Sequence, residues 1–189
     1  MDVNQYLRKF FTVIKKIEFT MTASGKHLTF SRGVEIATET IQALKKRGNK
    51  LIFVGNGGSA AIAVHQAADF LKQCGIKTYA PFDPSLLTCM ANDYGYPKVF
   101  SEPLKTLVEK GDILVAISSS GRSENILNAV GMVQVKSCYV ITMSGFNRTN
   151  PLRKKGDLNF YVPSSSYRYV ETAHQLICDC ILDCVLGEK

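Results

Sequence analysis

Residues 51–60 read LIFVGNGGSA, an apolar run that ends in three glycines, an asparagine and a serine. A continuous apolar run is typical of a strand that is buried on both faces of a parallel sheet. A helical pattern begins at about residue 59, so the glycines form a turn between a strand and a helix. Glycine allows the backbone to approach a ligand closely, and the N–H groups of a helix N-terminus favour an anion such as phosphate. The stretch therefore indicates an anion site, although a tight turn alone would also explain its glycines.

The same arrangement returns in DILVAISSSGRSENIL, residues 112–127, where a buried strand leads through a small polar turn into a helix. The turn carries serines around Gly121, namely Ser118, Ser119, Ser120 and Ser123. Their hydroxyls, with that of Ser59 from the first turn, suit a phosphate dianion. Helix capping would explain one of these serines but not all of them. We therefore predict a phosphate-binding cradle where the two turns meet, at the carboxyl ends of the strands.

Strand and helix patterns alternate along the rest of the chain, which indicates an α/β fold with a parallel sheet covered on both faces. Apolar residues at helical spacing predict two helices before the first strand, over residues 2–20 and 31–47. No linker interrupts the pattern, so we expect residues 1–189 to form one domain. The other predicted strands cover residues 77–80, 112–118, 137–143 and 158–162, and the other helices cover residues 59–72, a stretch from about 85, 98–109, 123–134 and 167–187.

The composition is that of a globular domain of ordinary size, with 189 residues, 46% of them hydrophobic and 21% charged. No apolar stretch approaches the roughly 20 residues of a bilayer span, and the first residues lack the order of a signal peptide. We therefore expect a cytoplasmic protein without a membrane partner. The net charge of +7 lies mainly in residues 1–50, which carry ten Lys or Arg against four Asp or Glu. No nucleic-acid motif accompanies this charge, so we expect no nucleic-acid partner.

The six cysteines, at positions 74, 89, 138, 178, 180 and 184, show no paired spacing. We therefore expect reduced thiols, most of them buried. Cys178, Cys180 and Cys184 fall in a helical pattern near His174, which leaves a soft-metal site open as an alternative. His174 by itself is typical of a packed helix histidine.

The motifs GNGGSA (residues 55–60), CMANDYGY (89–96) and AISSSGRSENI (116–126) together resemble the sugar isomerase (SIS) family, and look most like its phosphoheptose isomerases. The resemblance covers nearly the whole chain. It implies a three-layer α/β/α sandwich with a five-stranded parallel sheet over residues 49–189, preceded by N-terminal helices in residues 1–48 that serve oligomerisation. It also implies a homotetramer with sites at subunit interfaces.

The resemblance assigns the phosphate to Ser59, Ser118, Ser120 and Ser123, with Gly57 and Ser119 in the same two turns. It assigns contacts with the sugar to Asn56, Asn92 and Asp93. All of these residue types match the family pattern, so a phosphorylated sugar is the expected ligand.

The chemical residues depart from the family pattern, which has His, Glu, Gln and His around a zinc ion. The corresponding positions here are His65, Asp69, Glu171 and Asp179. The first two are four residues apart and share a helix face, and the last two lie along one ridge of the closing helix. Polar residues opposite a core stripe are often merely solvated, but these would lie beside a phosphate cradle. One histidine and three carboxylates form a harder ligand set than the family's, so a divalent ion other than zinc is an alternative.

Aldose–ketose isomerisation needs a base beside the carbonyl group and a group that polarises the oxygens of the enediol. We expect Glu171 to be the base, with Asp69 second, and Asp179 to take part in the chemistry. The expected reaction converts sedoheptulose 7-phosphate to D-glycero-D-manno-heptose 7-phosphate. The alternative is a non-catalytic SIS module that binds a sugar phosphate or a protein partner. Because aspartate is a poor proton donor, we expect either a divalent metal at these four residues or little activity.

Overall fold

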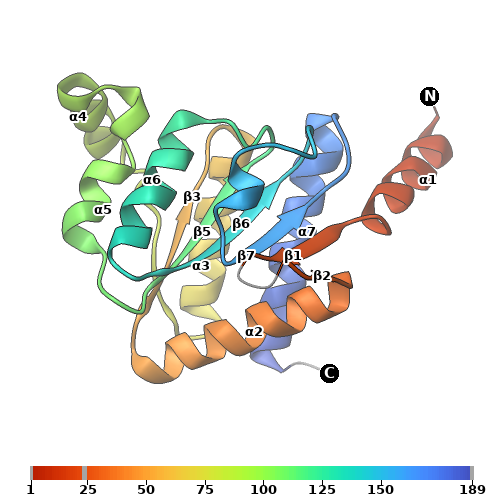
Figure 1. The fold of residues 1–189 in the computed structure, drawn as a ribbon, viewed down its shortest axis with the longest axis horizontal. Coiled ribbons are helices and arrows are strands. Elements are labelled where there is room, and N and C mark those ends of the chain that lie inside the picture. The colour runs from red at the N-terminus through yellow and green to blue at the C-terminus, as the bar shows by residue number, and fades with distance from the viewer. Residues whose placement is uncertain (1, 23–24, 188–189) are drawn as a thin grey trace.

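The computed structural model describes residues 2–22 and 25–187 and shows one twisted sheet with helices on both faces (Figure 1). The strands follow the order β2-β1-β7-β6-β5-β3-β4. Their bounds are β1 Glu18–Met21, β2 His27–Leu28, β3 Lys50–Val54, β4 Lys77–Tyr79, β5 Ile113–Ser118, β6 Tyr139–Ser144 and β7 Leu158–Tyr161.

The predicted parallel sheet of five strands is confirmed, because β4, β3, β5, β6 and β7 pair in parallel. The described residues add β1 and β2, which pair antiparallel on the outer edge of β7 and bring the sheet to seven strands. The parallel strands end on the same edge, so the turns after β3 and β5 lie next to each other.

The prediction of one helix over residues 2–20 is wrong for residues 15–20. Helix α1 (Val3–Ile14) ends early, and Glu18–Met21 form β1 instead. Phe19 is fully buried, and its ring centroid lies 5.1 Å from that of Phe160 on β7. Glu18 forms ion pairs with Arg148 and Arg153, which lie 130 and 135 residues further along the chain and hold the same strand. These contacts between distant parts of the chain outweigh the local helical spacing.

The other predicted helices are confirmed, with small shifts at their ends. The stretch predicted as one helix over residues 98–109 forms a short 3-10 turn followed by a short helix. The helices and 3-10 turns are α2 Phe30–Arg47, α3 Gly58–Lys72, α4 Pro84–Tyr94, η1 Tyr96–Lys98, α5 Ser101–Leu107, α6 Glu124–Val135, η2 Leu152–Lys154 and α7 Tyr167–Leu186.

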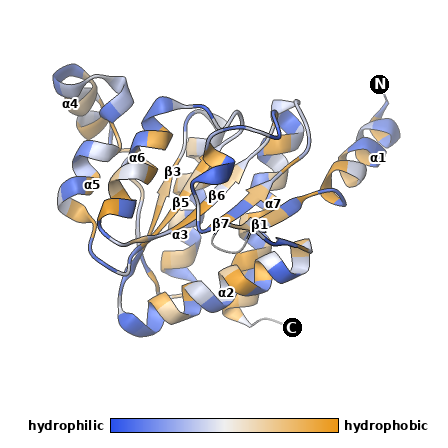
Figure 2. Cartoon of the chain, in the orientation of Figure 1, coloured by the Kyte–Doolittle hydropathy of each residue, from blue (hydrophilic) through white to orange (hydrophobic). Residues whose placement is uncertain are grey.

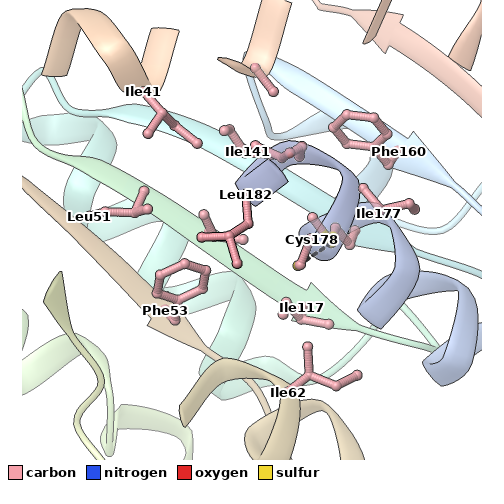
Figure 3. Close-up of a cluster of buried hydrophobic side chains, with 14 of the residues drawn as sticks. Ile41, Leu51, Phe53, Ile62, Ile117, Ile141, Phe160, Ile177, Cys178 and Leu182 are labelled. Carbon is pink, nitrogen blue, oxygen red and sulfur yellow. Dashed lines mark hydrogen bonds between the residues drawn. The ribbon is translucent and has the colours of Figure 1, made fainter. Parts of the chain in front are cut away.

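Two apolar clusters hold these layers together. Helices α2, α3 and α7 cover one face of the sheet, and α5 and α6 cover the other. Figure 3 shows the first cluster, in which Leu182 of α7 lies toward Phe53 of β3 and Ile177 of α7 lies on the side of Phe160 of β7. Figure 2 shows the hydrophobic strands enclosed by helices whose outer faces are hydrophilic. Helix α7 is thus fixed against the sheet on one side, which leaves its polar side free to form a site.

The cysteines agree with the predicted reduced state. All six are free, with Cys74, Cys138 and Cys178 buried and Cys180 partly buried. No described helix is long and apolar enough to cross a membrane. Helix α1 stands apart from the rest of the molecule in Figure 1, and none of its residues is buried.

Candidate active site

A pocket of about 120 Å³ lies at the carboxyl ends of β3 and β5. We call it the serine pocket, and its lining is Asn56, Ser59, Ser118, Ser119, Ser120, Ser123, Tyr167 and Glu171. The structure therefore brings the five predicted serines together with Asn56 and with Glu171 from the closing helix. The sheet topology explains this meeting, because neighbouring parallel strands deliver their turns to the same edge.

The first turn has a shape that only glycine permits at two positions. A Cβ atom on Gly55 would lie 2.5 Å from the carbonyl oxygen of Ser59. Gly57 has a φ of 53°, in the left-handed region, and precedes the first residue of α3. The turn therefore folds back tightly enough to bury Ser59 at the start of α3.

The second turn packs closely against the loop after β6 and is hydrogen-bonded to it. Gly121 has a φ of 62°, and a Cβ atom there would lie 2.0 Å from Asn150 Oδ1. Asn150 is fully buried, and its Nδ2 atom donates to the carbonyl oxygens of Gly145 and Asn147. The N–H groups of Gly145 and Leu152 in turn donate to the carbonyl oxygens of Ser119 and Gly121 over 2.9 and 3.1 Å, which fixes the path of the serine turn.

Three hydroxyls of this turn have hydrogen-bond partners within it. Ser118 Oγ donates to Ser123 Oγ over 3.3 Å, and the backbone N–H of Arg122 donates to Ser120 Oγ over 3.2 Å. Ser119 Oγ is buried and has no hydrogen-bond partner among the described residues. A buried hydroxyl without a partner costs free energy. Gln66 Oε1 and His174 Nδ1 are the other two such atoms among the described residues, and of the three residues only Ser119 lines the serine pocket.

Glu171, in the first turns of α7, packs directly on the start of α3. A Cβ atom on Gly58 would lie 2.6 Å from Glu171 Oε2 and 2.7 Å from Oε1. Only a glycine at this position leaves room for the carboxylate. The free N–H groups of a helix N-terminus favour a negative charge there, so the carboxylate is held at the wall of the serine pocket.

Tyr167 was missed by the sequence reasoning. It lies one turn before Glu171 on α7, and its ring makes an edge-on contact with Phe146 at 4.7 Å between centroids. The spacing of four residues from Glu171 was the available signal, because residues four apart share a helix face. The exposed tyrosine adds an aromatic wall to the pocket.

Asn56 and the segment around Asn92 are placed differently. The Asn56 side chain lines the serine pocket and exchanges hydrogen bonds with Asn125, a second residue that sequence reasoning missed. Asn92 and Asp93 are exposed on α4 and bond to each other over 2.9 Å. Neither lines the serine pocket of this chain, although Tyr96 from the same motif donates to Asn56 Oδ1.

The remaining predicted chemical residues engage other partners. His65 Nε2 lies 3.2 Å from Asp69 Oδ2, and the His65 side chain is 62% exposed. Asp179 Oδ1 accepts from Gln66 Nε2 and from Gln175 Nε2, each over 2.7 Å. Asp179 therefore ties α7 to α3 through an amide.

These contacts bear on the metal that the family pattern implies. Over residues 2–22 and 25–187, no three His, Cys, Asp or Glu side chains lie close enough together to hold a metal ion. Two amides already occupy one oxygen of Asp179, and Glu171 packs against Gly58. The arrangement within one chain thus does not fit a metal at His65, Asp69, Glu171 and Asp179, nor does it support the alternative cysteine site.

His174 lies one turn after Glu171 but faces the sheet. It is fully buried, and its Nε2 atom lies 3.3 Å from the carbonyl oxygen of Ser144. Burial lowers the pKa of His174 from 6.5 to about 4, against the weaker opposing effect of that hydrogen bond. The ring is therefore neutral near pH 7 and takes the packing role expected of it.

Comparison with known proteins identifies the family to which this chain belongs. Residues 20–145 match the model of the SIS domain. The phosphoheptose isomerase of Helicobacter hepaticus is 32% identical over 174 residues, which cover 89% of this chain and 88% of the relative. That of Aliarcobacter butzleri is 37% identical over 148 residues, covering 75% of this chain and 76% of the relative.

Two solved structures superpose on this chain along almost its full length. The phosphoheptose isomerase from Neisseria gonorrhoeae superposes with a TM-score of 0.82 at 27% identity, covering 97% of this chain and 96% of that one. The one from Francisella tularensis gives a TM-score of 0.84 at 26% identity, covering 99% and 97%. The chain therefore belongs to the SIS domain family, in the group of the phosphoheptose isomerases.

Proposed function

We propose that this protein is an aldose–ketose isomerase that converts sedoheptulose 7-phosphate to D-glycero-D-manno-heptose 7-phosphate. The observation that carries the proposal is the position of Glu171. Its carboxylate lies in the same pocket as the five serines of the phosphate cradle. The names of the relatives supply the substrate, because the matched proteins are called phosphoheptose isomerases.

The serine pocket suits a phosphate ester, although no cationic side chain is among the residues that line it. Hydroxyls from two turns and the N–H groups at the start of α6 offer several donors to the phosphate oxygens. Hydrogen bonds to a charged group contribute about 1.5–3 kcal/mol each. The cradle therefore anchors one end of the sugar and leaves its carbonyl end for the chemistry.

Glu171 acts as the base. It removes a proton from carbon 1 of the ketose, and the electron pair forms the double bond of an enediol. A proton moves from the oxygen on carbon 1 to the oxygen on carbon 2, and the proton held by Glu171 returns to carbon 2, giving the aldose. Because the described residues of one chain do not converge on a metal, no step of this proposal uses one. The expectation of either a metal or little activity therefore becomes a question of rate, which the exchange experiment below measures.

Deuterium exchange tests the reaction even where net turnover is slow. The protein is incubated with sedoheptulose 7-phosphate in deuterated water, and NMR follows deuterium at carbons 1 and 2. We expect deuterium in both ketose and aldose, since the proton on the base exchanges with solvent. Binding of the sugar phosphate without exchange or product would instead identify a non-catalytic binding module.

Assembly into a homo-oligomer, with a tetramer as the expected form, belongs to the same proposal. Val3, Leu7 and Phe11 follow one another at four-residue spacing on α1, and they are 74%, 44% and 60% exposed. Within the described part of the chain, the ring contacts of α1 are those of Tyr6 and Phe10 with Tyr169. An exposed apolar stripe of this kind favours burial against another copy. A monomer by light scattering at micromolar concentration would rule this assembly out.

A further inference from the structure

The side-chain amide of Asn56 takes part in a reciprocal pair. Asn56 Nδ2 donates to Asn125 Oδ1 over 2.9 Å, and Asn125 Nδ2 donates to Asn56 Oδ1 over 2.9 Å. Such a pair would be equally good with both amides rotated by half a turn, because each amide carries both donors and an acceptor. The pair alone therefore does not decide which end of Asn56 is the donor.

A backbone group decides it. The N–H of Ile126 is shared between the carbonyl oxygen of Ser123, at 3.1 Å, and Asn125 Oδ1, at 3.0 Å. A backbone N–H can only donate, so a rotated Asn125 would place two donors against each other. Asn125 is only 2% exposed, so water has little access to relieve such a clash. The orientation of Asn125 is thereby fixed, and that of Asn56 follows from it.

Tyr96 completes the arrangement from the 3-10 turn η1. Its hydroxyl lies 2.9 Å from Asn56 Oδ1 and must donate, since that atom is an oxygen. Both lone pairs of Asn56 Oδ1 are then used, and one Nδ2 proton goes to Asn125. The other N–H of Asn56 has no partner among residues 2–22 and 25–187, and Asn56 lines the serine pocket.

We propose that Asn56 is a locked hydrogen-bond donor to the carbonyl oxygen of the bound sugar, and that Asn125 and Tyr96 are the positioning residues that keep it a donor. The inference rests on the proposed isomerase function. As Glu171 removes the proton from carbon 1, negative charge gathers on the oxygen of carbon 2. A donor held in place beforehand stabilises this charge without reorganising, which makes Asn56 a catalytic residue.

Asn125→Asp tests the lock with almost no change in shape. The new carboxylate still accepts from Ile126, but it sets an oxygen against Asn56 Oδ1 and so removes the fixed polarity. We expect kcat to fall by roughly tenfold to a hundredfold, because a lost oxyanion donor costs about a hundredfold or more. The affinity for inorganic phosphate should change less than about twofold, because the serines remain in place.

The matched control is Asn128→Asp, the same change one turn along α6. Asn128 Nδ2 donates to the carbonyl oxygen of Pro97 over 2.9 Å, so it holds the turn that carries Tyr96 without touching Asn56. We expect its kcat to fall by no more than about threefold, because Asn128 acts on Tyr96 only through the turn and leaves the Asn56–Asn125 pair intact. A loss equal to that of Asn125→Asp would overturn the proposal, because support of the turn would then explain both.

Tyr96→Phe keeps the test decisive if Asn125→Asp fails to fold. Tyr96 is 59% exposed, so the loss of its hydroxyl leaves the fold intact. We expect kcat to fall by about threefold to tenfold, with phosphate affinity unchanged. If kcat is unchanged, or if phosphate affinity falls as much as kcat, the proposal is wrong.

A binding measurement separates this inference from the proposed function. In ¹⁵N-labelled protein the side-chain N–H signals of Asn56 are those lost in Asn56→Asp. Sedoheptulose 7-phosphate should shift one of them, and inorganic phosphate should shift neither. A bound sugar phosphate that leaves both signals unchanged overturns the donor role. A sugar phosphate that does not bind overturns the proposed function, and this inference with it.

Discussion

Two groups of polar residues include side chains of α3, and they differ in the contacts that fix their positions. The serine pocket is built on turns whose paths are forced by glycines and by neighbouring strands. The second group, which we call the α3–α7 polar group, comprises His65, Gln66, Asp69, Gln175 and Asp179. In the first group the serines line one pocket. In the α3–α7 polar group most of the polar atoms bond within the group, although Gln66 Oε1 is buried without a partner among the described residues. The comparison assigns ligand binding to the first group and helix packing to the second.

Among the variants that leave Glu171 in place, Gly58→Ala should produce the largest effect, because it displaces the carboxylate of Glu171 in the pocket. The added methyl group would lie within 2.6 Å of the carboxylate and must displace it. A base displaced by about 1 Å can cost roughly a hundredfold in rate. Deuterium exchange should fall by about this factor, while the midpoint of thermal unfolding should not fall, since alanine favours a helix more than glycine does.

Gly131→Ala is the control for this change. Gly131 lies in α6 with open space where its Cβ atom would be, so the substitution should stabilise the fold by up to about 1 kcal/mol and leave the exchange rate unchanged. Equal exchange rates for Gly58→Ala and the unmodified protein would show that Glu171 does not act from this position.

Asp179→Ala should affect stability rather than binding. It removes the acceptor of two hydrogen bonds and leaves the buried amide of Gln66 unpaired. We expect the free energy of unfolding to fall by about 2–3 kcal/mol, measured by urea denaturation. Asp183→Ala, at an exposed site one turn further on, should change it by less than about 0.5 kcal/mol. If Asp179→Ala is stable but loses phosphate binding, the division between the two groups breaks down.

The pH dependence of stability adds a test of His174, which lies on the side of α7 that packs against the sheet and belongs to neither polar group. Its pKa is about 4 in the folded protein against 6.5 in the unfolded chain, so below pH 6.5 the unfolded chain binds the extra proton. Stability from this source is complete above about pH 6.5 and should fall by about 2 kcal/mol by about pH 5. Urea denaturation at several pH values should show this slope, and His174→Leu should lack it. The same slope in both proteins would contradict the assignment.

Ser120→Ala should have the smallest effect of the series. It removes one donor of the cradle, so the affinity for sedoheptulose 7-phosphate should fall roughly tenfold. Isothermal titration measures this directly. Asp69→Asn, in the α3–α7 polar group, should change the same affinity by less than about twofold. An unchanged affinity for Ser120→Ala would place the phosphate elsewhere.

The same comparison explains how much could be predicted from the sequence. The serines were predictable because a turn after a parallel strand lies at a known edge of the sheet, whatever the side chains do. The contacts of residues on helix faces were not predictable in this way. Asp179, for example, accepts from the side-chain amide of Gln66 on another helix, and no local pattern in the sequence indicates that contact. Asn125 was missed for the same reason, whereas Tyr167 did have a local signal in its spacing of four residues from Glu171. In the fold, β1 was missed because Phe19 is placed by Phe160, a residue far away in the chain.

The most direct test of the account is the rate of deuterium exchange into sedoheptulose 7-phosphate for two isosteric variants, Glu171→Gln and Asp69→Asn. Both remove a negative charge with little change in size, one in the serine pocket and one in the α3–α7 polar group. If Glu171 is the base, Glu171→Gln should slow exchange by about a hundredfold to ten-thousandfold, and Asp69→Asn should slow it by less than about threefold. The opposite order, with Asp69→Asn abolishing exchange and Glu171→Gln retaining it, would contradict the account.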